Sequence, residues 1–202
     1  DRSVSRGLGD VYKRQVFGVS GAMGSTLARD VLANLARVPG LEIHLIVSDG
    51  AKTVLKAENE LTFDDLTRYA HTVYDAGNMA ASPSSGSWRH SGMVICPCSM
   101  SSLASIATGA GRNLIHRAAD VTLKERLPLV IVARETPLSR IHLRNMLALS
   151  ESGAVIMPFS PSFYPRKATF SHLAAHFAGR ILDQLGIENT PVSYTHLTLP
   201  TT

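Results

Sequence analysis

The sequence predicts a single doubly wound α/β domain, in which a mainly parallel β-sheet carries helices on both faces. Short, almost continuously apolar segments alternate along the chain with longer segments whose apolar residues recur at helical spacing. Strands of a parallel sheet are buried on both faces, so they lack the polar–apolar alternation of a half-exposed strand. The composition, 45% hydrophobic and 18% charged over 202 residues, is ordinary for one globular domain.

Six apolar segments are the predicted strands, and they cover residues 16–19, 41–47, 71–75, 92–96, 129–133 and 154–157. A first helix follows the first strand and is ended by Pro39-Gly40. Its apolar face is formed by Leu27, Val31, Leu32 and Leu35. A second helix begins at residues 48–50, and a closing helix covers residues 170–185. No internal repeat or linker divides the chain.

The two ends of the chain read as the same DNA in opposite directions. Residues 10–15, DVYKRQ, would be encoded by GATGTGTATAAGAGACAG, and the reverse complement of that DNA encodes the VSYTH of residues 192–196. Such an inverted repeat resembles a transposon-end sequencing adapter read through as protein. We therefore expect residues 1–15 and 191–202 to be adapter-derived and the domain to cover residues 16–190. A genuine basic arm and a polar tail are the alternative.

Charge and composition argue against several classes of function. The basic N-terminal arm carries +2 of the formal net charge of +4, and no Lys/Arg run with interleaved aromatic residues suggests nucleic-acid binding. No apolar stretch approaches the roughly 18 residues of a membrane span, and no signal-peptide pattern opens the chain. Cys96 and Cys98 suit neither a disulfide framework nor a zinc site, so we expect reduced, buried thiols in a cytoplasmic protein. His172 and His176 lack a third ligand, so we expect no metal.

Three predicted strand-to-helix junctions carry small or hydroxyl residues, at positions 20–22, 48–50 and 99–102. In doubly wound sheets, ligands bind beyond the carboxyl ends of the strands, where helix N-termini offer free N–H groups and suit a phosphate. The glycines do not form G-x-G-x-x-G, so we expect no binding of NAD or FAD at these junctions. Taken alone, each junction is explained better by an ordinary helix cap.

Several motifs closely resemble the UbiX-type flavin prenyltransferases, and the resemblance covers residues 16–189. They are GVSGA (18–22), AASPSSGSW (80–88), PCSM (97–100), LIHRAADVTLKERLPLVIVARETPL (114–138), SPSFY (160–164) and GRILDQLGI (179–187). The resemblance implies a flavodoxin-like, Rossmann-type fold in a homo-oligomer such as a dodecamer. It implies a metal-independent transferase that joins the dimethylallyl group of dimethylallyl phosphate to N5 and C6 of reduced FMN. The product, prenylated FMN, would serve UbiD-type decarboxylases in ubiquinone biosynthesis or acting on aromatic acids.

The resemblance also implies a set of site residues. It assigns FMN contacts to Gly21, Ala22, Met23, Ser48, Ser99, Met100, Ser101, Ser102 and Arg134. It assigns the dimethylallyl phosphate to Lys124, Tyr164 and Arg180, and catalytic roles to Glu58, Lys124, Arg134 and Glu135. Cations from separate segments suit a closed anion pocket, and a carboxylate near the flavin suits removal of the C6 proton. Without the resemblance, the same residues would be explained by solvated helix faces and surface ion pairs, such as Arg180 with Asp183.

The chain departs from the family pattern at one position of the expected site. Met23 stands where the family usually carries serine, which removes a hydroxyl close to the flavin or the leaving phosphate. This loss keeps open the alternative of a non-catalytic flavin-binding or delivery subunit. The other alternative is an FMN-dependent decarboxylase of the same superfamily, against which the set of Lys, Arg and Tyr residues favours the transferase. Trp88 lies in a Ser/Gly-rich loop that either covers a prenyl group or only anchors the loop, and the apolar residues 141–149 favour a multimer.

Overall fold

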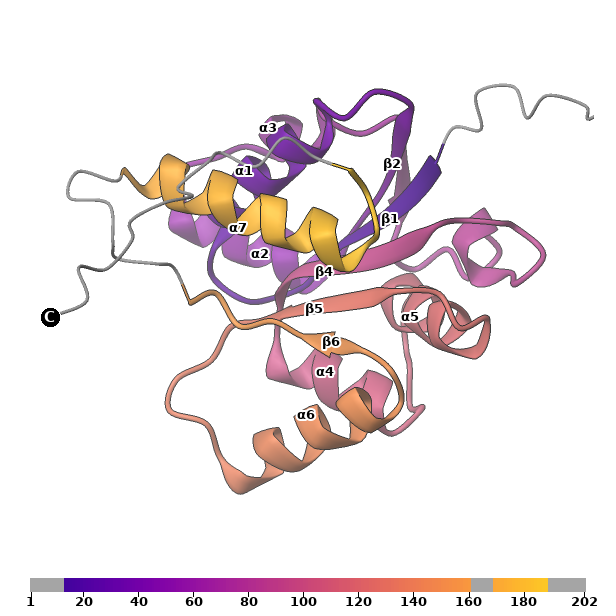
Figure 1. The fold of residues 1–202 in the computed structure, drawn as a ribbon. Helices are drawn as coiled ribbons and strands as arrows, with labels where there is room; N and C mark the ends of the chain where they lie inside the picture. The colour runs from indigo at the N-terminus through magenta and orange to yellow at the C-terminus, as the bar shows by residue number, and fades with distance from the viewer. Residues whose placement is uncertain (1–12, 161–168, 189–202) are drawn as a thin grey trace, which may run out of the picture.

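A computed structural model describes residues 13–160 and 169–188 of the protein. Its centre is a six-stranded sheet with the order β3-β2-β1-β4-β5-β6, in which every neighbouring pair is parallel (Figure 1). The strands are β1 (Lys13–Val19), β2 (Leu41–Val47), β3 (Thr72–Asp75), β4 (Gly92–Cys98), β5 (Leu129–Ala133) and β6 (Val155–Ile156). This order is that of the Rossmann fold, and it confirms the predicted doubly wound α/β class.

Helices cover both faces of the sheet. One face packs against α1 (Ser25–Leu35), α2 (Asp49–Glu58), α3 (Phe63–Thr67) and α7 (Phe170–Gln184). The other packs against α4 (Met100–Ala107), α5 (Leu114–Lys124) and α6 (Arg140–Glu151). Successive residues of a strand contribute to opposite faces, so Phe17 joins the first core and Val16 the second. A single 3₁₀ turn, η1 (Ser82–Ser84), lies between β3 and β4.

The observed boundaries agree closely with the sequence-based expectations. The strands β2 and β5 have the predicted ends, β4 runs on to Cys98, and the closing helix stops one residue early, at Gln184. The strand β1 begins at Lys13, three residues ahead of the expected domain start, and Lys13 pairs with Leu41 at the beginning of β2. The sequence-based prediction did not delimit α3 to α6. In the described parts of the chain, no helix is both long and apolar enough to cross a membrane.

The core also holds the two cysteines, which are buried and free. Burial raises the pKa of the Cys98 thiol to about 12 and that of the Cys96 thiol further still. Both thiols therefore stay protonated and unreactive at neutral pH.

Gln15 is an unusual residue for the central strand of such a sheet. Its side chain is 1% exposed and lies beside Leu185, and neither Oε1 nor Nε2 has a hydrogen-bond partner. Because a buried amide without partners loses its hydration and regains nothing, we expect Gln15→Leu to raise the free energy of unfolding by about 1–2 kcal/mol. Urea unfolding would measure the gain, with Lys13→Leu, at an exposed position of the same strand, as control. Equal stability of Gln15→Leu and wild type would contradict the prediction.

Candidate active site

The order of the strands reverses between β1 and β4, since β2 and β3 lie on one side of this pair and β5 and β6 on the other. Chains leaving the carboxyl ends of β1 and β4 therefore separate toward opposite faces of the sheet. The crevice that this leaves is the usual ligand site of doubly wound folds. The predicted junctions after β1, β2 and β4 all lie at this edge.

Ser20 joins the junctions after β1 and β4. Its hydroxyl is buried, donates a hydrogen bond to the carbonyl of Pro97 (3.2 Å) and accepts one from the backbone N–H of Ser99 (2.8 Å). The Ser99 hydroxyl in turn accepts from the backbone N–H of Ser102 (3.2 Å) and caps α4. Ser20 thus fixes the two loops against each other, a role that its place in a small-residue junction did not reveal.

The junctions after β1 and β2 touch through two glycines. A Cβ atom at Gly21 would lie 3.1 Å from the carbonyl carbon of Gly50, so the Gly50 backbone would have to move by a few tenths of an ångström. Glycine at position 21 therefore favours this close approach. Ser48 caps α2 by accepting a hydrogen bond from the backbone N–H of Ala51 (3.1 Å). The structure brings all three small-residue junctions together, as the sequence predicts.

Glu58, at the end of α2, reaches the beginning of α1. Its carboxylate accepts hydrogen bonds from the backbone N–H groups of Gly24 (2.7 Å) and Ser25 (3.1 Å) and from the Ser25 hydroxyl. Gly24 has a φ of 120° and provides no side-chain cap for α1, so the Glu58 carboxylate caps the N-terminus of this helix. Burial alone would raise the pKa of Glu58, but these hydrogen bonds and the charge of Arg134 together lower it. Glu58 is therefore an ionised residue that positions the loop.

Arg134 follows β5 directly and lies on the exposed side of the junctions. Its Nη2 is 3.9 Å from the sulfur of Met23, and its guanidinium forms no ion pair with any residue of the described ranges. Met23 itself is 54% exposed. Glu135 is exposed and accepts a hydrogen bond from the backbone N–H of Thr136 (3.1 Å). An unpaired guanidinium beside small side chains and free backbone N–H groups is suited to bind an anion.

Two of the predicted phosphate ligands lie away from these junctions in the same chain. Lys124 ends α5 and so precedes β5, whereas Arg134 follows it; the five residues of β5 put about 13 Å between these edges of the sheet. The Lys124 ammonium pairs with Glu125 and lies against Gly86, since a Cβ there would be 2.6 Å from its Nζ. Lys124 therefore belongs to the amino edge of the sheet, opposite the candidate site.

Arg180 lies ten residues into α7, about 15 Å from its first turn at the carboxyl edge. The far end of α7 reaches the amino edge, where Leu185 contacts Gly92 at the start of β4. The Arg180 guanidinium pairs with Asp183 at 2.7 Å, the i,i+3 pair that the sequence also suggests. The third predicted phosphate ligand, Tyr164, lies outside the described residues.

Trp88 lies at the amino edge as well. Its ring packs between His44 and His90, with centroid distances of 4.8 and 5.7 Å, and Arg14 lies over it at 5.5 Å. This packing anchors the loop after η1 within the chain. Trp88 also lines a cavity of about 550 Å³ that adjoins Lys124 through Gly86 and Glu125.

His116 is a functional neighbour of the site that sequence reasoning missed. It is buried, its Nδ1 accepts from the backbone N–H of Arg112 (3.1 Å), and its Nε2 lies 3.1 Å from the Ser102 hydroxyl. Since Nδ1 is an acceptor, Nε2 carries the proton and donates it to Ser102. Burial also lowers the pKa of His116 and keeps it neutral. Ser102 is thus tied into the α4–α5 contact, while Ser101 is exposed, and no spacing in the sequence signals the pair.

Metal ligation finds no geometric support in the described residues, where no three His, Cys, Asp or Glu side chains gather. His172 and His176 on α7 therefore belong to no such group of three among these residues.

Comparison with known proteins gives consistent matches over most of the chain. The sequence profile of the family described as Flavoprotein matches residues 5–174. Flavin prenyltransferase UbiX of Deinococcus radiodurans is 48% identical over 178 residues, covering 88% of this chain and 90% of the relative. Flavin prenyltransferase LpdB of Lactiplantibacillus plantarum is 46% identical over 177 residues, covering 88% and 95%.

Solved structures show the same relationship. A UbiX protein (AnUbiX) crystallised with FMN and dimethylallyl pyrophosphate superposes with a TM-score of 0.83 at 44% identity, covering 87% of this chain and 93% of that one. A dodecameric protein of Escherichia coli O157:H7, described as an FMN-dependent UbiX-like decarboxylase, superposes with a TM-score of 0.85 at 40% identity, covering 91% and 100%.

Proposed function

Because this chain belongs to the flavoprotein family, we propose that it is a UbiX-type flavin prenyltransferase, which forms prenylated FMN from reduced FMN and dimethylallyl phosphate. The observation that carries the proposal is the unpaired Arg134 guanidinium beside three interlocked junctions of small residues. The identity of 44–48% to named flavin prenyltransferases, over more than four-fifths of the chain, supports it.

The junction residues fit the phosphate and ribityl groups of FMN. The loop at Gly21 and the first turn of α4 at Met100 and Ser101 offer backbone N–H groups, and Ala22 beside them adds little side-chain bulk, with its own N–H bonded to the Ser20 carbonyl (2.7 Å). Helix N-termini of this kind favour a phosphate through their free N–H groups and their dipole. Arg134 supplies the charge at the exposed side. Bound there, reduced FMN supplies the nucleophilic N5 and C6 positions that accept the dimethylallyl group.

A second copy of the chain best accounts for Lys124. The residue lies at the amino edge, about 13 Å from the carboxyl edge that carries Arg134, so one chain does not bring the two cations together. In an oligomer, the amino edge of one subunit packed against the carboxyl edge of another would place Lys124 beside the leaving phosphate. The dodecameric state of one relative supports assembly into an oligomer. Two cations facing the departing anion would lower the barrier to its departure.

Exposed apolar side chains offer the surface for this assembly. They gather on α6 and just before it, and they are Leu138 (39% exposed), Ile141 (67%), Leu143 (51%) and Leu147 (58%). A helix that leaves such residues in water is expected to pack against another copy. The proposal therefore includes a homo-oligomer. It also includes a cytoplasmic location, in which Cys96 and Cys98 stay reduced. The product would be delivered to a UbiD-type decarboxylase.

The two carboxylates take different parts in this scheme. Glu58 stays ionised, holds the beginning of α1 and faces the charge of Arg134. Glu135 is exposed next to Arg134, with one oxygen bonded to the backbone of Thr136, and its other oxygen is open to accept the C6 proton. Met23 fills the place of the usual serine with an exposed thioether and offers no hydroxyl.

Incubation of the protein with reduced FMN and dimethylallyl phosphate, without metal, is expected to yield a flavin heavier by one prenyl unit. Mass spectrometry of the released flavin would measure it, with dimethylallyl pyrophosphate as a second donor to compare. We expect Met23→Ser to be equally or more active, since it restores a hydroxyl beside Arg134. If wild type and Met23→Ser both bind FMN but neither changes the mass of the flavin, the protein is instead a flavin carrier.

One relative is described as a dodecameric decarboxylase, so FMN-dependent decarboxylation is the second candidate function. An FMN-dependent decarboxylase would release CO₂ from a carboxylic acid in the presence of oxidised FMN alone. A separate incubation with oxidised FMN and a carboxylic acid, sampled for CO₂, distinguishes this reaction from prenyl transfer. The basic character of Arg134, Lys124 and Arg180 favours the phosphate-bearing substrate.

A further inference from the structure

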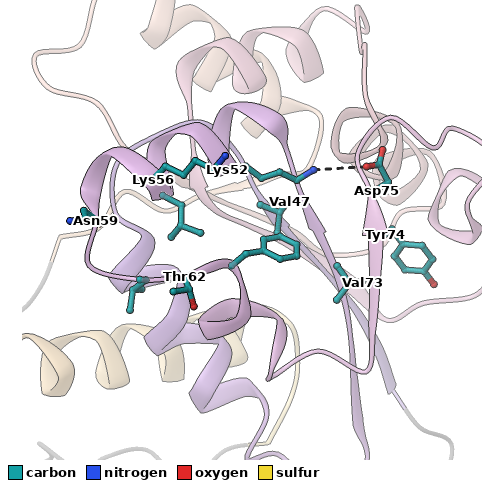
Figure 2. A pocket seen from close by; sticks show the side chains of 11 residues that line it. Val47, Lys52, Lys56, Asn59, Thr62, Val73, Tyr74 and Asp75 are labelled. Atoms are coloured by element: carbon teal, nitrogen blue, oxygen red, sulfur yellow. Dashed lines mark ion pairs between the residues drawn. The ribbon is translucent and has the colours of Figure 1, made fainter.

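A second cavity, of about 630 Å³, lies on the side of α2 that faces away from the junctions (Figure 2). It opens where β2 and β3 end and is bounded by α2, α3 and the turn between them. Five apolar side chains form its floor and walls: Val47, Leu55, Leu61, Phe63 and Val73. Its volume lies within the range of small-molecule sites.

Part of this apolar lining is exposed to water. Phe63 is 39% exposed and Val73 is 42% exposed, although both are large hydrophobic residues. Figure 2 shows Val47 and Val73 on the strand side of the cavity, and Phe63 is part of the same lining. An apolar body that covered both side chains would remove this surface from water and gain the corresponding free energy.

The rim of the cavity carries an uncompensated positive charge. Lys52 is paired, with its Nζ 3.0 Å from Asp49 and 3.9 Å from Asp75. Lys56, one turn further along the same face of α2, forms no ion pair or hydrogen bond with any described residue. One ammonium group is therefore free to pair with an anionic ligand group at the mouth of the cavity.

We propose that this cavity binds a small monocarboxylate with a ring-sized apolar body, its carboxylate on Lys56 and its body against Phe63 and Val73. A single free ammonium matches a monoanion. The site is separate from the proposed flavin site and does not depend on it, because α2 presents different faces to the two. Gly50 and Glu58 face the junctions, whereas Lys52, Lys56 and Asn59, at i, i+4 and i+7, face the cavity.

The probe for the test is 4-ethylbenzoate, titrated into the FMN-saturated protein and followed by saturation-transfer NMR. We expect saturable binding that FMN does not displace, and about tenfold weaker binding of 4-ethylbenzyl alcohol, which has the same body without the charge. Lys56→Gln is also expected to raise the dissociation constant for 4-ethylbenzoate about tenfold, because it removes one partly exposed charged contact. Arg37→Gln, the same loss of charge at another exposed position, should leave binding unchanged.

A second variant tests the apolar wall. Val73→Asp places a carboxylate and removes a hydrophobic surface on the exposed side of β3, so 4-ethylbenzoate binding should fall below detection while FMN binding persists as evidence of folding. The proposal is overturned if the acid and the alcohol bind equally, if Lys56→Gln binds like wild type, or if FMN competes with 4-ethylbenzoate. Failure of the wild type to bind the acid also overturns it. None of these outcomes bears on prenyl transfer, which is measured separately.

Discussion

Subunits carrying Lys124→Gln and subunits carrying Arg134→Gln are each expected to be inactive alone and to recover prenyl transfer when co-expressed. The two cations lie at opposite edges of the sheet, Lys124 before β5 and Arg134 after it. If each site takes Arg134 from one subunit and Lys124 from another, either variant alone lacks one cation in every site. Each is expected to lose at least about a hundredfold in rate, or about 2.7 kcal/mol of transition-state stabilisation.

In a mixed oligomer, a site is complete where a Lys124→Gln subunit supplies Arg134 and an Arg134→Gln subunit supplies Lys124. With equal amounts and independent assembly, about a quarter of the sites would hold both cations. The measurement is the rate of formation of the heavier flavin, per mole of protein, in the co-expressed preparation. Co-expression of two differently tagged Lys124→Gln chains is the control and should stay inactive. Two outcomes would show that Lys124 does not complete the site of another subunit. One is full prenyl-transfer activity of Lys124→Gln alone, and the other is no activity of the co-expressed preparation although mixed oligomers are shown to form.

Glu58→Ala is expected to lower the free energy of unfolding by about 2–3 kcal/mol and to abolish tight FMN binding. The substitution leaves the backbone N–H groups of Gly24 and Ser25 without the charged acceptor that now receives them. The start of α1 would then lose the carboxylate that caps it, because Gly24 has no side chain to take its place. Urea unfolding and FMN titration would measure both effects.

The matched control is Glu60→Ala, which removes the same charge two residues away. Glu60 accepts one hydrogen bond, from the Thr26 hydroxyl (3.1 Å), and no backbone N–H. Its replacement is expected to cost no more than about 0.5 kcal/mol, as for other exposed side-chain pairs. Equal effects of the two substitutions would contradict the capping role of Glu58.

The same carboxylate makes stability depend on pH in a defined direction. The pKa of Glu58 is lower in the folded protein than its ordinary value, because the hydrogen bonds and Arg134 outweigh the effect of burial. Its stabilising contribution is therefore present above about pH 4.3, the ordinary value for glutamate, and is lost as the pH falls through the lower folded value. Glu58→Gln, which does not titrate, should lack this part of the acid-induced loss.

The sheet and the place of the ligand crevice could be predicted because they depend on local patterns. Apolar segments such as residues 41–47 identify buried parallel strands, and small residues directly after them identify the junctions. Contacts between distant residues left no such pattern. The capping of α1 by Glu58 spans 34 positions, and the partnership of Ser102 with His116 depends on how α4 and α5 pack. The resemblance supplied Glu58 and Lys124 as site residues. It did not supply the geometry, in which Glu58 caps α1 and Lys124 lies at the edge of the sheet opposite Arg134.

The contacts among the junctions also predict which amides of the site exchange slowly with solvent. The loop after β1 touches the loop after β2 through Gly21 and Gly50, and Ser20 ties it to the loop after β4. No one of these loops opens without disturbing the other two, so their amides should exchange with solvent together and slowly. The segment from Arg134 to Arg140 is exposed throughout, and its printed ties to the junctions lie at Arg134, whose N–H donates to the Cys98 carbonyl (3.2 Å) and whose guanidinium contacts Met23. We therefore expect the amides of residues 135–138 to exchange with solvent faster than those of the three junction loops.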